Sequence, residues 1–229
     1  MIPIAVVAHT SRLPRAEALA DAVKAELLTI DNGTAGPGYN HLVAWEWLAE
    51  SWRDGSGNPW SVVLEDDALP VQGFQEQLKA VLDKSPCDVV SLYLGRGRPP
   101  QWQTSIQRVI TEDVHFYRAP ELLHHVGVAV RSKYVATMLT QLNRVDLSRV
   151  PIDEAIGKWV RQRRKTVAYC HPSIVDHDHR MTSTIMEHTS RHKTESGERN
   201  DPREIRKAWA FGSRRRWNSS VKDMPPPTM

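Results

Sequence analysis

Cysteine is almost absent from the chain, which has two among its 229 residues. Cys87 and Cys170 cannot build a disulfide framework and have no metal-binding spacing, so we expect free thiols in a reducing cytoplasm. A long hydrophobic run is also lacking. The apolar start, residues 1–8, is too short to cross a membrane and carries neither a basic leader nor a cleavage site. We therefore expect a cytoplasmic protein without a membrane span.

A strong net charge is lacking too, because 30 Lys and Arg residues face 27 Asp and Glu residues, which leaves +3. This balance gives no global electrostatic field that would argue for binding to nucleic acid. The remaining composition, 40% hydrophobic and 25% charged, is that of an ordinary soluble protein. The length allows one large α/β domain, or one domain with an appendage.

The apolar pattern predicts strands that alternate with helices. A strand over residues 2–8, a helix over 15–27 and a strand over 27–30 form the repeating unit of a parallel sheet. Further helices are predicted over 39–52, 74–82 and 132–142 and from 151 onwards, and further strands over 62–64, 88–94, 103–110, 126–130 and 166–170. The fold class expected from this order is α/β.

Three carboxylates, Glu65, Asp66 and Asp67, directly follow the apolar strand at residues 62–64. Ligands of open α/β sheets bind at the carboxyl ends of strands, so these acids lie where chemistry is expected. Adjacent anions repel one another unless a positive group is bound, and oxygen ligands suit Mg²⁺ or Mn²⁺. Strand alternation would place Glu65 and Asp67 on one face and Asp66 on the other. A solvated acidic turn is the plain alternative.

A second cluster, residues 176–179, contains two aspartates and two histidines. A neutral imidazole can complete a cation site begun by carboxylates elsewhere, and alternation would put His177 and His179 on the same side. The order His-x-His-x-Asp-His of zinc hydrolases is absent. An open cation site shared with a phosphate ligand is therefore favoured over an all-protein zinc site.

From residue 180 onwards charge replaces apolar periodicity. We expect a catalytic domain over residues 1–179 and a basic, aromatic C-terminal arm over 180–229, with a short helix near 201–209 and a disordered end. Arginines interleaved with aromatic residues can neutralise phosphates and stack on bases, whereas a solvated tail is the alternative. The candidate contacts to acceptor or nucleic acid are Arg96, Arg98, Trp102, Arg206, Lys207, Arg214, Arg215, Arg216 and Trp217.

The order of these features resembles the GT-A glycosyltransferases, and within them family 25, the lipopolysaccharide and collagen-type galactosyl and glucosyl transferases. The family's Leu-Glu-Asp-Asp strand end matches residues 64–67, and its preceding Gly-rich loop and helix match residues 36–47, with His41, Trp45 and Glu46. Residues 127–132 and 151–153 match its later segments more loosely. The likeness extends through about Val175.

The resemblance implies a GT-A-like (Rossmann-like), mixed and mostly parallel sheet flanked by helices, and a nucleotide-sugar donor, most simply a UDP-sugar. Asp67, with Glu65, would hold Mn²⁺ or Mg²⁺, and His177 or His179 would be the final ligand. Glu65 or Asp66 would contact the ribose. The other implied donor contacts are Ala8, His9, Thr10, Arg12, Asp31, Asn32, Gly38 and Asn40.

The resemblance also implies that Asp153 is the general base for the acceptor hydroxyl, with Glu154 as the next candidate. It does not explain the basic arm. Some phage-encoded glycosyltransferases modify hydroxylated bases in their own DNA, and a small enzyme with a basic arm looks similar. We therefore expect hydroxylated double-stranded DNA as acceptor and the host cytoplasm as location, with a glycan or protein acceptor as the alternative.

Two further interpretations remain open at this point. A metal-dependent phosphohydrolase or nuclease could use the same acids and histidines. A DNA-binding module without catalysis would depend on the basic arm alone, and the acid-ended central strand argues against it.

Overall fold

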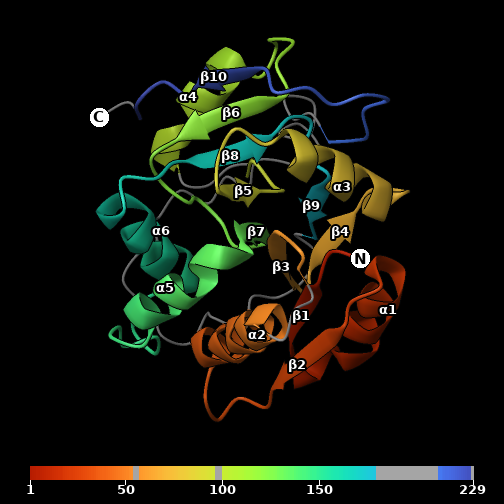
Figure 1. Ribbon diagram of the computed structural model, residues 1–229, viewed down its shortest axis with the longest axis vertical. Coiled ribbons are helices and arrows are strands. Elements are labelled where there is room, and N and C mark those ends of the chain that lie inside the picture. The colour runs from red at the N-terminus through yellow and green to blue at the C-terminus, as the bar shows by residue number, and fades with distance from the viewer. Residues whose placement is uncertain (54–56, 96–99, 179–210, 228–229) are drawn as a thin grey trace, which may run out of the picture.

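A computed structural model of the chain describes residues 1–53, 57–95, 100–178 and 211–227 (Figure 1). Its main feature is an eight-stranded sheet with the order β10-β6-β8-β5-β7-β3-β1-β2. The strands are β1 Ile4–His9, β2 Leu27–Asp31, β3 Trp60–Glu65, β5 Val89–Ser91, β6 Phe116–Ala119, β7 Gly127–Arg131, β8 Val167–Cys170 and β10 Val221–Asp223.

Most strands of this sheet run in one direction. β1 pairs in parallel with both β2 and β3, and β5 pairs in parallel with β8. β7 lies between these two groups and is antiparallel to its neighbours β3 and β5. The predicted α/β class is confirmed as a mixed, mostly parallel sheet flanked by helices, and its GT-A-like character stays a prediction.

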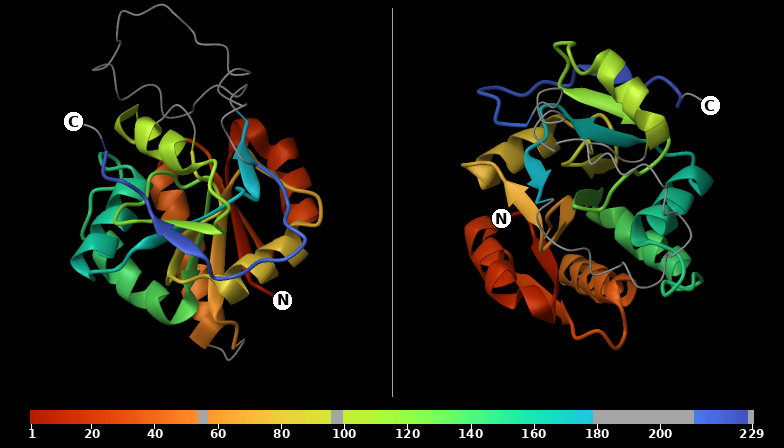
Figure 2. Two further views of the ribbon diagram at one scale, coloured as in Figure 1. Left: turned by 90° about the horizontal axis from the view of Figure 1, so that it is seen from above. Right: turned by 180° about the vertical axis from the view of Figure 1, so that it is seen from behind.

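Helices cover both faces of the sheet (Figures 1 and 2). One face carries α1 Leu13–Val23 and α3 Phe74–Lys84, and the other carries α2 Pro37–Ser51, α4 Pro100–Val109, α5 Ser132–Leu142 and α6 Ile152–Gln162. A 3₁₀-helix, η1 Thr10–Arg12, joins β1 to α1. Each face has its own apolar core, so both sides of the central strands are buried.

The amphipathic pattern of α6 explains its position. Its apolar stripe, predicted from the sequence, is buried throughout: Ile152, Ala155, Ile156, Trp159 and Val160. Burying an aliphatic or aromatic side chain of this size contributes about 1.5–3 kcal/mol, so the stripe fixes the helix against the sheet. Its first turn, which carries the candidate base Asp153, is thereby held in a defined place.

A second, two-stranded sheet joins distant parts of the chain. β4 Ala68–Pro70 pairs antiparallel with β9 Val175–His177, with Ala68 opposite His177. β4 begins directly after the acidic triplet, so this pairing brings His177 beside it. This sheet was not predicted from the sequence, because each of its strands has only three residues.

The strand predicted over residues 103–110 is wrong, because this segment belongs to helix α4. Trp102, Ile106 and Val109 are buried, and their spacing of four and three residues places them on one face of a helix. Strand β6 follows at Phe116–Ala119 and was not predicted.

The C-terminal segment differs from the expected free arm wherever it is described. β10 pairs in parallel with β6, and the side chains of Trp217 and Met224 are buried in the two cores. The expected disorder is therefore not found in residues 211–227, because the pairing and these two apolar side chains attach this segment to the sheet. The short helix predicted near 201–209 lies outside the described residues, and the boundary at residue 179 stays a prediction.

No helix in the described ranges is long and apolar enough to cross a membrane.

Gly38 shows how closely α2 and the segment after α5 approach each other. A Cβ atom at Gly38 would lie 2.6 Å from the carbonyl oxygen of Leu147, whereas one at Gly157 in α6 would meet nothing closer than 3.7 Å. We expect Gly38→Ala to lower the free energy of unfolding by about 1–3 kcal/mol, the usual cost of overpacking. Gly157→Ala, the control, should raise it by about 0.5–1 kcal/mol. Urea unfolding of both variants tests this, and equal effects would contradict it.

Candidate active site

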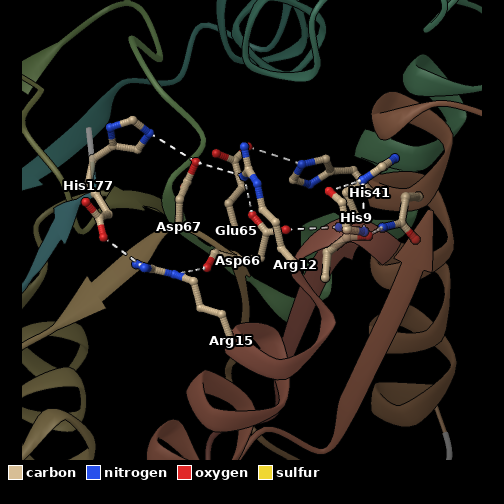
Figure 3. A network of polar contacts seen from close by, with 12 residues as sticks. His9, Arg12, Arg15, His41, Glu65, Asp66, Asp67 and His177 are labelled. Atoms are coloured by element: carbon tan, nitrogen blue, oxygen red, sulfur yellow. Dashed lines mark hydrogen bonds and ion pairs between the residues drawn. The ribbon is translucent and has the colours of Figure 1, made fainter. Parts of the chain in front are cut away.

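The candidate site lies at the edge of the sheet where the parallel strands end. β1 ends at His9 and β3 at Glu65, and these two strands are neighbours. Because β7 runs the opposite way, its beginning lies at this same edge, with Gly127 opposite Leu64. Figure 3 shows the side chains that these strand ends bring together.

Asp66 is buried and has partners on both carboxylate oxygens. Its Oδ1 lies 2.7 Å from Nη1 of Arg12, and its Oδ2 accepts a hydrogen bond of 3.0 Å from the backbone N–H of His9. Its backbone carbonyl accepts from Nε of Arg15 at 3.0 Å. Asp66 thus connects the end of β3 to η1 and α1 (Figure 3). Its ribose contact stays a prediction.

Asp67 faces His177, as the cation-site hypothesis requires. Oδ2 of Asp67 lies 3.1 Å from Nε2 of His177 and 3.4 Å from Nη1 of Arg12. The other carboxylate oxygen, Oδ1, is buried and has no hydrogen-bond partner in the described part of the chain. An anionic oxygen in this state is costly unless it meets a donor or a cation.

The charges around Asp67 keep it ionised. Burial by itself would raise the pKa of Asp67, but the hydrogen bond and charge of His177 and the charges of Arg12 and Arg15 leave this pKa below its usual range. For His177, burial lowers the pKa, but the hydrogen bond that the imidazole donates to Asp67 and the negative charges of Asp67, Glu65 and Asp176 together outweigh it, so the pKa is raised. The pair is therefore an aspartate facing an imidazole with increased proton affinity.

Asp178 contacts both Arg15 and the backbone of Asp67. Its carboxylate lies 2.8 Å from Nη1 of Arg15, and its backbone N–H donates to the carbonyl of Asp67 at 2.9 Å. These contacts hold the segment after β9 against the acidic triplet. His179, the other predicted ligand, lies outside the described residues.

Glu65 has other partners than Asp67, and the predicted sharing of one face stays a prediction. β3 ends at Glu65, and the chain turns at residues 66–67. Oε1 of Glu65 lies 3.2 Å from Nε2 of His41 and 3.9 Å from Nδ1 of His125. Glu65 and Asp67 therefore pair with different histidines (Figure 3).

His125 was missed by the sequence analysis, although His41 was noted within the Gly-rich loop and helix. The ring centroids of His41 and His125 lie 4.3 Å apart in an edge-to-face arrangement. His125 precedes β7, and the backbone N–H of Glu65 donates to the carbonyl of Val126 at 3.1 Å. Only the antiparallel direction of β7 brings His125 here, and no local signal in the sequence specifies that direction.

Asp153 lies in the first turn of α6, with Glu154 beside it. Its Oδ1 accepts a hydrogen bond of 2.9 Å from the backbone N–H of Glu154. Burial and the negative charge of Glu65 raise the pKa of Asp153 to about 6. This pKa suits a general base near neutral pH. Glu154 is exposed.

The predicted donor contacts near β1 and β2 have mainly structural partners. Nδ2 of Asn40 donates to the carbonyls of Ala8 and Thr29, at 3.0 and 3.3 Å, and so ties α2 to both strands. The carboxylate of Asp31 and the side-chain oxygen of Asn32 each accept a backbone N–H two residues on. Thr10 is exposed at the end of β1. Their contacts to a nucleotide stay predictions.

The predicted acceptor contacts are only partly available at the surface. Trp102 and Trp217 are 2% and 6% exposed, so neither offers a free stacking surface, which corrects the expectation from the sequence. Arg214 is also engaged, because its guanidinium bonds the carbonyls of His171 and Val114 and the carboxylate of Asp113. Arg215 and Arg216 are exposed. Arg96, Arg98, Arg206 and Lys207 lie outside the described residues.

Comparisons with known proteins yield distant structural similarity only. No protein-family model matches the chain, and no curated protein matches it. The crystal structure of A197 from STIV aligns with a TM-score of 0.43 and 10% identity, over 76% of this chain and 83% of that chain. A glycosyltransferase involved in the glycosylation of the major capsid of PBCV-1 aligns with a TM-score of 0.36 and 7% identity, over 70% and 78%. Both scores are below 0.5, so neither likeness carries an argument about function.

Proposed function

We propose that the protein is a metal-dependent glycosyltransferase, which moves a sugar from a nucleotide-sugar, most simply a UDP-sugar, to an acceptor hydroxyl. The observation that carries this proposal is the buried, unpartnered Oδ1 of Asp67 beside His177, at the carboxyl ends of β1 and β3. Nucleotide ligands of open α/β sheets bind at this edge.

The donor groups at Asp67 fit a divalent cation. A carboxylate with a free oxygen and an imidazole nitrogen 3.1 Å from its other oxygen are ligands that Mn²⁺ accepts, and Mg²⁺ would use the carboxylate. When bound, the cation would neutralise the charge that develops on the leaving nucleoside diphosphate. Arg12, 3.4 Å from Asp67, places a fixed positive charge beside the same position.

The chemical step assigned to the protein's own residues is proton removal. The acceptor oxygen bonds to the anomeric carbon as the bond from that carbon to the diphosphate oxygen breaks, and the hydroxyl proton passes to the carboxylate of Asp153. The pKa of about 6 leaves Asp153 ionised at neutral pH while keeping appreciable proton affinity.

Isothermal titration with UDP, with and without Mn²⁺, tests the proposal. A nucleotide-sugar transferase should bind UDP tightly only when Mn²⁺ is present, because Asp67 would hold a cation that neutralises the charge of the diphosphate. UDP binding that does not depend on Mn²⁺ would contradict the proposal. Cleavage of phosphate esters without sugar transfer would favour the phosphohydrolase or nuclease alternative.

The acceptor proposed from the sequence, a hydroxylated base in double-stranded DNA, rests on fewer groups than expected, and a glycan or protein stays the alternative. In the described part of the predicted arm, Arg215 and Arg216 keep exposed side chains, whereas Arg214 is engaged. If both exposed arginines contact DNA phosphates, Arg215→Ala with Arg216→Ala should lower the log–log salt slope of DNA binding by about 2, roughly 0.9 per contact.

Fluorescence anisotropy with labelled duplex DNA at several salt concentrations measures this slope. Lys79→Ala, which removes an exposed cation on α3 paired with Asp83, is the control and should leave it unchanged. A wild-type protein that shows no DNA binding at low salt would shift the acceptor to a glycan or protein.

A further inference from the structure

We propose that His41, Glu65 and His125 form a second cation site, which binds a first-row transition metal such as Zn²⁺ without any nucleotide. This site uses other histidines than the pair Asp67 and His177, because Glu65 pairs with His41 whereas Asp67 pairs with His177 (Figure 3). It does not depend on the proposed transferase activity.

The geometry of the three side chains is close to that of a bound state. One ligand atom from each residue lies within 4.8 Å of the other two, and Oε1 of Glu65 is 3.2 Å from Nε2 of His41. Zinc bonds of about 2.0–2.2 Å require ligand atoms roughly 3–3.6 Å apart in a tetrahedral site. Small side-chain movements would therefore close the site around an ion.

Burial gives the second, independent indication of a ligand. The side chains of His41 and His125 are 4% and 1% exposed. Neither ring nitrogen of His125, nor Nδ1 of His41, has a hydrogen-bond partner in the described ranges. A buried polar group without a partner destabilises the folded state, and a metal bond to one nitrogen of each ring would remove part of that cost.

The chemistry of the three ligands selects the class of ion. Two imidazoles and one carboxylate favour Zn²⁺ or Fe²⁺ over Mg²⁺ and Ca²⁺, which prefer oxygen. The side chain of Glu65 is 28% exposed, which provides a path for the ion from solvent.

The ligand set has an alternative without metal, a hydrogen-bonded pair of His41 and Glu65 with His125 packed against it. That arrangement satisfies Nε2 of His41 but leaves both nitrogens of His125 unpaired. The two interpretations differ in one measurable quantity, the affinity of the metal-stripped protein for Zn²⁺ in the absence of nucleotide.

The test is titration of metal-stripped protein with Zn²⁺ by calorimetry, with Co²⁺ absorption as a spectroscopic readout. We expect Glu65→Gln and His125→Gln each to weaken Zn²⁺ at this site at least about 100-fold, beyond the 10–100-fold that losing an outer-shell partner causes. Asp67→Asn should leave this affinity unchanged. His115→Gln, which alters a buried histidine bonded to Asn218 elsewhere, is the matched control.

Unchanged Zn²⁺ affinity in both Glu65→Gln and His125→Gln, or loss of the Zn²⁺ site in Asp67→Asn, would overturn the proposal. If a variant fails to fold, X-ray absorption of the Zn²⁺-loaded wild type decides. Two imidazoles with one carboxylate support the site, whereas a single imidazole contradicts it. Failure here leaves the Mn²⁺-dependent binding of UDP unaffected, so the two proposals fail separately.

Discussion

Asp67→Asn should abolish the Mn²⁺-dependent binding of UDP and lower sugar transfer by at least about 10²–10³-fold, the loss typical when one group that stabilises transition-state charge is removed. Asparagine keeps the size of the side chain but carries no negative charge for the cation. It can still hydrogen-bond to Nε2 of His177, which lies 3.1 Å from Oδ2 in the wild type. Titration calorimetry and a transfer assay at saturating Mn²⁺ measure both effects.

Asp83→Asn is the matched control for that substitution. Asp83 is an exposed aspartate on α3 whose carboxylate pairs with Lys79, so its replacement should change neither UDP binding nor transfer. Circular dichroism and thermal melting should show that both variants fold. Full transfer by Asp67→Asn, or undiminished wild-type activity in excess EDTA, would remove Asp67 and the cation from the mechanism.

The parts of the site that could be predicted from the sequence are those encoded locally. The strand before Glu65 is a continuous apolar run, and the amphipathic stripe of α6 begins directly after Pro151, so both elements lie where predicted. One of the two histidines His177 and His179 was expected near Asp67, because an imidazole can complete a cation site begun by carboxylates, and His177 lies there.

The parts that could not be predicted depend on contacts between distant segments. The pairing of β4 with β9 joins residues more than 100 positions apart, and the antiparallel direction of β7 places His125 beside Glu65. A three-residue strand has too little periodicity to be recognised. The residue pattern of a strand does not show whether it runs parallel or antiparallel to its neighbours.

The predicted stacking surface of the C-terminal arm is wrong for the same reason, because burial of an aromatic side chain depends on distant segments. Trp217 and Arg214 look like a nucleic-acid surface in the sequence, yet Nε1 of Trp217 donates to Oε1 of Gln77 at 2.8 Å and the indole is buried. Whether a tryptophan packs inward or faces solvent depends on the sheet it meets, here the edge formed by β6 and β10.

The raised pKa of Asp153 has a consequence for stability. The folded chain holds this proton up to a pKa of about 6, compared with 3.8 for the unperturbed side chain, so between these values it binds more protons than the unfolded chain. The contribution of Asp153 to the free energy of unfolding therefore falls as the pH rises from 3.8 to about 6. Asp153→Asn should remove this part of the pH dependence, which urea unfolding at several pH values can measure.

The same substitution should lower turnover by about 10²–10⁴-fold with UDP affinity unchanged, because asparagine cannot take the proton of the acceptor hydroxyl. In the wild type, turnover should rise with pH through an apparent pKa of about 6 as Asp153 ionises, and this acidic limb should be missing in Asp153→Asn. Glu154→Gln, which changes the exposed neighbour, should keep both turnover and the limb. If Asp153→Asn keeps wild-type turnover, the role of Asp153 is only structural, as the acceptor of the N–H of Glu154. Loss of turnover in Glu154→Gln would make Glu154 the base.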